Sequence, residues 1–249
     1  PVVRAAASLG IPCIIHESDM TPGLANKLCY GSAAKICCNF PETVASLPEK
    51  KAVLTGTPIR SELFTGDSEK GRELCGFKDD KPVLMVTGGS LGAMAVNQAV
   101  RDALPGLLEK YNVVHLCGKN KVDNMLLTTP GYTQFEYIKD GMKDLFALAD
   151  VIISRAGANA ICEILALHKP NILIPLPSKA SRGDQLLNAK SFESAGYSVV
   201  LDQDDLTSRL ICDTVDSVYA ERDKYISAMK NSAQKDAVSV IVKLIKELA

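Results

Sequence analysis

The sequence has no tryptophan, only three histidines and almost no net charge, because 28 basic residues stand against 29 acidic ones. A formal charge of -1 gives no overall attraction to a polyanion, so we expect no nucleic-acid partner. The chain also lacks a run of about 18 apolar residues, which argues against a membrane-spanning helix. Its eight cysteines include no C-x-x-C pair and no zinc-like cluster with histidine, and they are interpreted as reduced thiols of a cytosolic protein. Any anion that binds must therefore be held by a local arrangement of groups.

Short runs rich in isoleucine and valine alternate with helical patterns along the 249 residues. Such runs suit strands that are buried on both faces, and their alternation with helices predicts an α/β fold with parallel sheets. The predicted strands are Ile11 to Ile15, Lys35 to Cys38, Val53 to Thr55, Val83 to Thr87, Val113 to Leu116, Gln134 to Tyr137, Val151 to Ser154, Asn171 to Pro175 and Ser198 to Leu201.

A glycine-rich and charged stretch, Ser61 to Pro82, is the best candidate for a domain boundary. We assign residues 1–60 to the remainder of an N-terminal lobe and residues 61–222 to a complete second lobe. Residues 223–249 are expected to form helices that pack back on the first lobe, because the tail carries an apolar helical face. The chain starts in what resembles the body of a helix closed by Gly10, so we expect the first lobe to be truncated.

Three strand-loop-helix units carry the candidate chemistry. The strand Val83 to Thr87 ends in Gly88-Gly89-Ser90-Leu91-Gly92, where glycines and a helix start would favour a phosphate, although a turn without a ligand fits equally well. After the strand Val151 to Ser154, a helix bears Glu163, which could accept the hydroxyls of a ribose or be a partly exposed helix acid. In the third unit, Asp184 and Gln185 suit sugar hydroxyls, although Asp184 could instead cap a helix. The carboxyl ends of parallel strands share one edge of a sheet, so the three loops together predict a ligand site.

The same loops carry a resemblance to a known family. Gly88-Gly89-Ser90-Leu91-Gly92-Ala93, Arg155-Ala156-Gly157-Ala158 with Glu163, and Arg182-Gly183-Asp184-Gln185 with Asn188-Ala189 resemble the donor-binding signatures of the MurG family. His16-Glu17-Ser18-Asp19 with Pro22-Gly23-Leu24, and Thr55-Gly56-Thr57-Pro58-Ile59-Arg60, are similar to two further stretches of that family. The resemblance covers essentially the whole chain and implies two Rossmann-like, doubly wound lobes of the GT-B type, with the first lobe truncated.

The resemblance implies transfer of N-acetylglucosamine from UDP-N-acetylglucosamine to the muramyl 4-hydroxyl of lipid I, giving lipid II for peptidoglycan. The enzyme would be attached peripherally to the cytoplasmic face of the bacterial membrane. The implied roles are the diphosphate for Gly89, Ser90 and Arg60, the uracil for Tyr137 and Ile138, the ribose for Glu163, the ribose and phosphate for Arg155, the N-acetylglucosamine for Asp184 and Gln185, and the acceptor side for Asp19. Ala158 is expected to be a further substrate-binding residue.

The family's N-terminal loop with its general base does not occur in these residues, so we expect the chain alone to bind the donor without transferring it. Glu17 is a candidate for the base or the acceptor site, and a buried hydrogen-bonded acid is the alternative. Asp202-Gln203-Asp204 has the D-x-D form of metal-dependent transferases, but helix capping explains it better, so we predict neither a metal nor another cofactor. Two alternatives are a UDP-N-acetylglucosamine 2-epimerase and the non-catalytic donor-binding half of a split transferase.

Overall fold

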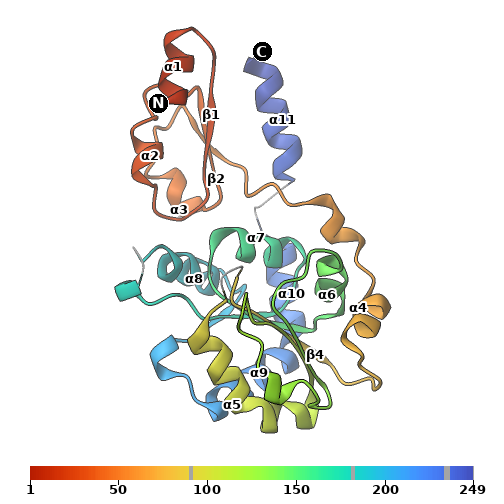
Figure 1. Ribbon diagram of the computed structural model, residues 1–249. Coiled ribbons are helices and arrows are strands. Elements are labelled where there is room, and N and C mark those ends of the chain that lie inside the picture. The colour runs from red at the N-terminus through yellow and green to blue at the C-terminus, as the bar shows by residue number, and fades with distance from the viewer. Residues whose placement is uncertain (90–91, 181–182, 233–235, 249) are drawn as a thin grey trace. The chain divides into compact units, whose positions relative to one another are not determined.

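The computed structural model describes residues 1–89, 92–180, 183–232 and 236–248 (Figure 1). The chain divides into two compact units, one formed by Pro1–Ile59 with Ser232–Ala249 and the other by Arg60–Asn231. Each unit is built on a parallel sheet with helical connections, which confirms the predicted α/β fold. Among the described residues, no helix combines the length and the apolar character that crossing a bilayer requires.

The first unit has a three-stranded sheet in the order β1 (Ile14–Glu17), β2 (Lys35–Cys38) and β3 (Ala52–Leu54). Its helices are α1 (Val2–Ser8), α2 (Leu24–Lys27), α3 (Pro41–Val44) and α11 (Ala237–Leu248). A small core holds the sheet together through side chains that are at most 8% exposed, namely Ile15, Ala33, Ile36, Cys38 and Leu47.

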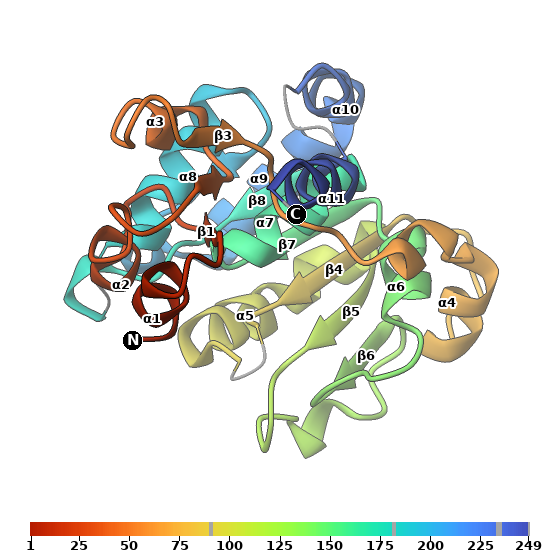
Figure 2. The same ribbon diagram turned by 90° about the horizontal axis from the view of Figure 1, so that it is seen from above.

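The second unit has a six-stranded parallel sheet in the order β6-β5-β4-β7-β8-β9, much of which is visible in Figure 2. Its strands are β4 (Val83–Thr87), β5 (Asn112–Leu116), β6 (Tyr132–Phe135), β7 (Val151–Ser154), β8 (Asn171–Leu173) and β9 (Val199–Val200). The chain winds outward from β4 to β6, then returns to the other side of β4 and continues from β7 to β9. The winding direction therefore reverses between β4 and β7, at the point where ligands bind in open sheets of this kind.

Helices cover both faces of this sheet, because right-handed crossovers made in opposite directions lie on opposite faces. α5 (Met94–Lys110) packs against α9 (Ser208–Ala220), and α4 (Ser68–Cys75) packs against α6 (Met142–Leu148). The remaining helices of the unit are α7 (Ala158–Ala166), α8 (Asp184–Ser194) and α10 (Arg222–Lys230), with 3-10 turns at Ser61–Thr65, Asn124–Leu126, Ser178–Ala180 and Gln203–Asp205.

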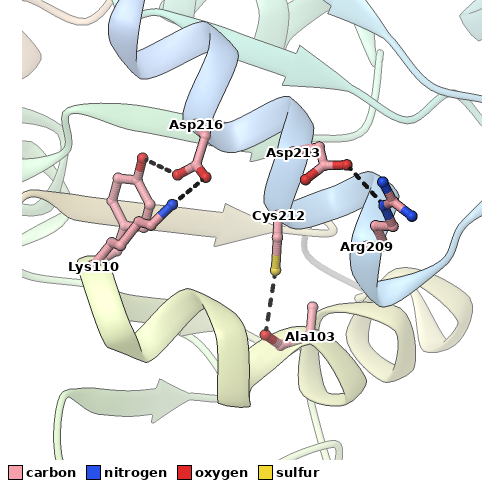
Figure 3. Close-up of polar contacts among 7 residues, drawn as sticks. Ala103, Lys110, Arg209, Cys212, Asp213 and Asp216 are labelled. Atoms are coloured by element: carbon pink, nitrogen blue, oxygen red, sulfur yellow. Dashed lines mark hydrogen bonds and ion pairs between the residues drawn. The ribbon is translucent and has the colours of Figure 1, made fainter.

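Polar contacts join α5 to α9 on one face of the sheet (Figure 3). The carboxylate of Asp216 on α9 accepts a hydrogen bond of 2.6 Å from Nζ of Lys110 and one of 2.8 Å from the hydroxyl of Tyr111. An exposed pair between Arg209 and Asp213, 3.4 Å apart, runs along α9 itself and joins no other element. Asp216 is thus the acid that fastens the end of α5 to α9.

Two polar side chains, one half-buried and one fully buried, fasten the amino ends of the strands. The carboxylate of Asp150 accepts a hydrogen bond of 2.8 Å from the backbone N–H of Val83 at the start of β4. Asn171, which begins β8 and is fully buried, donates to the carbonyl oxygens of Lys169 and Tyr197 at 3.0 and 3.1 Å. These groups satisfy backbone atoms that would otherwise be buried without partners.

Two predicted strands are displaced along the chain. β1, expected at Ile11 to Ile15, is observed at Ile14–Glu17, and β6, expected at Gln134 to Tyr137, is observed at Tyr132–Phe135. Gly131 adopts a left-handed φ of 76° and turns the chain one residue before the strand, and Tyr132 then pairs with Val113 of β5. The prediction placed Tyr137 inside the strand, whereas it lies in the loop that follows.

Candidate functional site

A cavity of about 180 Å³ lies at the carboxyl edge of the six-stranded sheet. It is lined by the ends of β4, β5 and β6, by α6 and by α7, through Arg60, Met85, Thr87, Gly89, Leu116, Glu136, Tyr137, Ile138, Met142, Phe146, Ala160, Glu163 and Ile164. Five of the residues predicted to bind substrate meet there, namely Arg60, Gly89, Tyr137, Ile138 and Glu163. Its walls are largely apolar with a few polar groups, as is typical of small-molecule sites.

Glu163 and Arg60 form the charged part of this cavity. α7 begins at Ala158, as expected, so Glu163 lies in the second turn, where its side chain is 23% exposed. Its Oε1 lies 3.4 Å from Nη2 of Arg60, whose side chain is 56% exposed. Burial raises the pKa of Glu163 above its usual range, and the guanidinium of Arg60 opposes that shift. The carboxyl group is an acceptor set in an apolar wall, where it could hold a pair of hydroxyls.

The glycine loop after β4 is closely packed at two positions. A β-carbon at Gly88 would come within 2.5 Å of the backbone nitrogen of Ala93, and one at Gly92 would overlap the carbonyl oxygen of Cys117. Gly92 and Gly89 both have left-handed φ angles, of 65° and 78°. Unlike one at Gly92, a β-carbon at Gly89 would meet no atom within 4 Å. Ala93 precedes α5 and provides no side-chain cap, so the N–H groups of the first turn suit an anion. Ser90 lies outside the described residues.

Arg155, in the second loop, donates hydrogen bonds to the backbone at the start of the third loop. Its side chain is buried, and it donates to the carbonyl oxygens of Ile174 and Pro175 at 3.0 and 2.9 Å and to Oε1 of Gln203 at 2.6 Å. Burial lowers the pKa of this guanidinium. Arg155 is not among the residues that line the cavity, so its contact with ribose and phosphate stays a prediction, as does substrate binding by the buried Ala158.

The acidic D-x-D sequence caps a turn, as expected, because the side chain of Asp202 accepts a hydrogen bond of 2.9 Å from the backbone N–H of Asp204. Over the described part of the chain, no three His, Cys, Asp or Glu side chains come together in a group that could hold a metal ion.

The third loop leads into α8, which begins at Asp184. Gly183, with a φ of 84°, stands at the N-cap, so Asp184 occupies the first helical position and the capping alternative for it is wrong. Oε1 of Gln185 accepts a hydrogen bond of 3.0 Å from the backbone N–H of Leu176 and so ties the two ends of the loop together. The roles of Asp184 and Gln185 towards the sugar stay predictions.

In the first unit, Glu17 is the last residue of β1 and is only 5% exposed. Its Oε2 accepts hydrogen bonds from the backbone N–H of Gly23 at 2.8 Å and from Nδ2 of Asn26 at 2.9 Å. The structure therefore has the buried, hydrogen-bonded acid that was the alternative to a catalytic Glu17. Nε2 of His16 lies 3.0 Å from the carbonyl oxygen of Gly56, and Asp19 is partly buried in the loop after β1.

Sequence reasoning missed several residues that line the cavity, above all Glu136, Thr87 and Phe146. Glu136 follows β6 directly, so the rule that ligands bind at carboxyl ends of strands could have found it had β6 been placed correctly. Phe146 lies on α6 and gave no local signal.

Comparisons with known proteins agree with this arrangement. Residues 83–245 match the glycosyltransferase family 28 C-terminal domain. The UDP-N-acetylglucosamine--N-acetylmuramyl-(pentapeptide) pyrophosphoryl-undecaprenol N-acetylglucosamine transferase of Lachnospira eligens is 59% identical over 247 residues, which cover 99% of this chain and 70% of that protein.

Two solved structures share the fold. The crystal structure of MurG from Acinetobacter baumannii has a TM-score of 0.78 and 26% identity, and the match covers 98% of this chain and 70% of that one. UDP-GlcNAc 2-epimerase from Neisseria meningitidis has a TM-score of 0.68 over 98% of this chain and 72% of that one, but only 13% identity, so the likeness is one of fold alone. By its domain match and its identity to curated relatives over nearly all of its length, the chain belongs to the MurG family of glycosyltransferases.

Proposed function

We propose that this chain belongs to an enzyme that transfers N-acetylglucosamine from UDP-N-acetylglucosamine to lipid I, and that its second unit holds the donor. The name of the Lachnospira eligens relative gives this donor and an N-acetylmuramyl-(pentapeptide) pyrophosphoryl-undecaprenol acceptor. The observation that carries the proposal is the cavity at the carboxyl edge of the six-stranded sheet, where Glu163 and Arg60 meet beside Tyr137 and Ile138. An apolar cleft that holds a carboxylate and a guanidinium, near the point where the winding of the sheet reverses, suits a nucleotide.

The cavity offers a separate group for each part of the nucleotide. The uracil would lie between the apolar wall of Ile138 and the exposed ring of Tyr137. Glu163 would accept the ribose hydroxyls, and the diphosphate would meet the backbone N–H groups at the start of α5 together with Arg60. Arg60 would then exchange its contact with Glu163 for one with the phosphates.

In the proposed reaction, the 4-hydroxyl of the muramyl sugar attacks the anomeric carbon with inversion, and UDP leaves. Negative charge grows on the leaving diphosphate, where the start of α5 and the guanidinium of Arg60 stabilise it without the need for a metal. Arg155 adds a buried positive charge near the same edge of the sheet. Because the carboxylate of Glu17 already accepts two hydrogen bonds, we infer that it shapes the loop after β1 and does not act as the base.

We further propose that the first unit belongs to an acceptor-binding lobe and the second to the donor lobe. The predicted boundary at residue 222 falls inside the second unit, which runs to Asn231, so we propose that the tail packs on the first lobe through α11. An acceptor that carries an undecaprenyl chain stays in the bilayer, so the acceptor lobe must work at its surface. We therefore place the enzyme peripherally at the cytoplasmic face of the membrane.

The proposal is tested by calorimetry of the chain with UDP-N-acetylglucosamine and UDP in the presence of a chelator. Both should bind, and ADP should not. Alanine at both Asp184 and Gln185 should lower the affinity for the nucleotide sugar towards that for UDP, since the amide nitrogen of Gln185 and the carboxylate of Asp184 would face the sugar. Binding that requires a divalent ion, or a preference for ADP, would contradict the proposed donor site.

A further inference from the structure

A chain of buried polar side chains runs under the glycine loop, outside the cavity itself. Nδ1 of His115 on β5 lies 2.9 Å from the hydroxyl of Tyr132 on β6, and its Nε2 lies 3.0 Å from Oδ1 of Asn97 on α5. Nδ2 of Asn97 in turn donates to the carbonyl oxygen of Cys117 at 2.8 Å. His115 and Asn97 are both fully buried, in a sheet whose interior is otherwise mostly apolar.

The direction of these hydrogen bonds follows from the last of them. A carbonyl oxygen only accepts, so the amide nitrogen of Asn97 must face Cys117 and its amide oxygen must face His115. Nε2 of His115 is then the donor, and its Nδ1 accepts from the hydroxyl of Tyr132. Burial lowers the pKa of His115 to about 3, in keeping with a neutral ring that has one donor and one acceptor. Every bond therefore points along one path that ends on the carbonyl oxygen of Cys117.

That carbonyl oxygen is the surface against which the glycine loop packs. β4 and β5 pair from Val83 to Thr87, so Gly88 and Cys117 leave the sheet side by side. Gly92 comes so near the carbonyl oxygen of Cys117 that a β-carbon would overlap it. Nζ of Lys121 also donates to the carbonyl oxygen of Gly92 at 3.4 Å. The loop after β5 is therefore a wall for the glycine loop.

The same wall is fastened from β6. Arg101 on α5 donates through Nη2 to the carbonyl oxygen of Lys121 and to Oε1 of Gln134, which lies 3.0 Å away. Glu136, which lines the cavity, accepts a hydrogen bond of 2.9 Å from the backbone N–H of Asn120. A wall held at so many points has little freedom to move away from the glycines.

We propose that Asn97 and His115 are positioning residues for the donor diphosphate. By fixing the carbonyl oxygen of Cys117 they fix Gly92, and so they aim the backbone N–H groups at the start of α5 at the phosphates. The inference rests on the proposed donor site. It predicts that loss of these side chains weakens the binding of UDP, which carries the diphosphate, and leaves the binding of uridine, which lacks it, nearly unchanged. Uridine would use the opposite part of the cavity, at Tyr137, Ile138 and Glu163.

The test compares UDP and uridine in NMR titrations of the 249-residue chain, which register weak binding. Asn97→Leu keeps the size of the side chain and removes the donor to Cys117. It should weaken UDP binding about five- to tenfold and change uridine binding by less than about twofold. Asn171→Leu is the matched control, because Asn171 is equally buried and also donates to backbone carbonyls, but at the amino end of β8. It should leave the ratio of the two affinities unchanged.

A second pair of variants covers the case in which Asn97→Leu does not fold. Glutamine at position 115 can keep a donor for Oδ1 of Asn97, whereas leucine cannot, so His115→Gln should retain more of the preference for UDP over uridine than His115→Leu. Equal losses of UDP and uridine affinity in Asn97→Leu, or an equal preference in the two His115 variants, would overturn the positioning role. A wild-type chain that binds neither ligand would overturn the proposed donor site instead.

Discussion

Replacing Glu163 by alanine should weaken UDP binding by about 1 to 3 kcal/mol, or about 5- to 150-fold in Kd. The carboxylate is 23% exposed and lies in an apolar wall beside Ile138 and Ile164, so its hydrogen bonds to ribose hydroxyls would be partly shielded from water. Its lost contact with Arg60 adds little, because the guanidinium is 56% exposed and such pairs are worth about 1 kcal/mol or less.

The assay is calorimetry with UDP and with 2′,3′-dideoxy-UDP, which lacks the two hydroxyls. Wild type and Glu163→Ala should bind the dideoxy ligand with similar affinity, since the interaction under test is absent from both. Glu62→Ala is a matched control. Glu62 lies 3.0 Å from the same Arg60, but its side chain is 62% exposed and it is not among the residues that line the cavity. The binding free energy of UDP should change by less than about 0.5 kcal/mol in Glu62→Ala.

Two results would refute this reasoning. Unchanged affinity of Glu163→Ala for UDP would remove the ribose role. An equal loss of affinity for UDP and for the dideoxy ligand would mean that Glu163 shapes the cavity and does not bind the hydroxyls.

Two further predictions concern packing and pH. Gly92→Ala should lower the free energy of unfolding by about 2 kcal/mol or more and abolish tight UDP binding, because the new β-carbon would overlap the carbonyl oxygen of Cys117. Gly89→Ala should lower the free energy of unfolding by only about 1 kcal/mol, since the positive φ is its only source of strain. Thermal unfolding measures the two losses of stability, and calorimetry measures the binding of UDP. Burial would raise the pKa of Asp216, but hydrogen bonds from Lys110 and Tyr111 outweigh it and lower the pKa in the folded protein. The carboxylate therefore stabilises the fold fully at pH values above the unfolded pKa of about 3.9. This stabilisation is lost as the pH falls through the lower pKa of the folded state. Urea unfolding of Asp216→Asn should therefore show a loss of about 1 kcal/mol at pH 7 that shrinks towards pH 3, with Asp213→Asn, on the exposed pair, as a control that changes little at either pH.

The strands next to the switch point were predictable because their signals are local. β4 and β7 occupy the residues expected for them, since each is a run of buried apolar side chains followed by a glycine-bearing loop. From those two strands, the shared carboxyl edge and the meeting of Gly89 with Glu163 follow by the rules of parallel sheets.

What escaped prediction depends on partners far along the chain. The start of β6 is set by a turn at Gly131 and by pairing with β5, neither of which shows in its own hydrophobic pattern. The contacts of Arg155 with Pro175 and Gln203 span 20 and 48 residues, so its use as a backbone brace could not be inferred from its own motif. His115 carried a local signal, a single polar residue in an apolar run, but its partners lie on two other elements.

Two groups of polar side chains lie at opposite ends of the strands in the six-stranded sheet. Asp150 and Asn171 complete hydrogen bonds of the backbone at the amino ends of the strands, while Glu163, Tyr137 and the glycine loop stand at the opposite ends. Such a separation allows specificity to evolve without loss of the scaffold, because a substitution in a nucleotide-facing loop leaves the amino-end anchors intact. Directed evolution towards another sugar nucleotide should therefore accept changes at Tyr137 and Ile138 readily, and should reject them at Asn171.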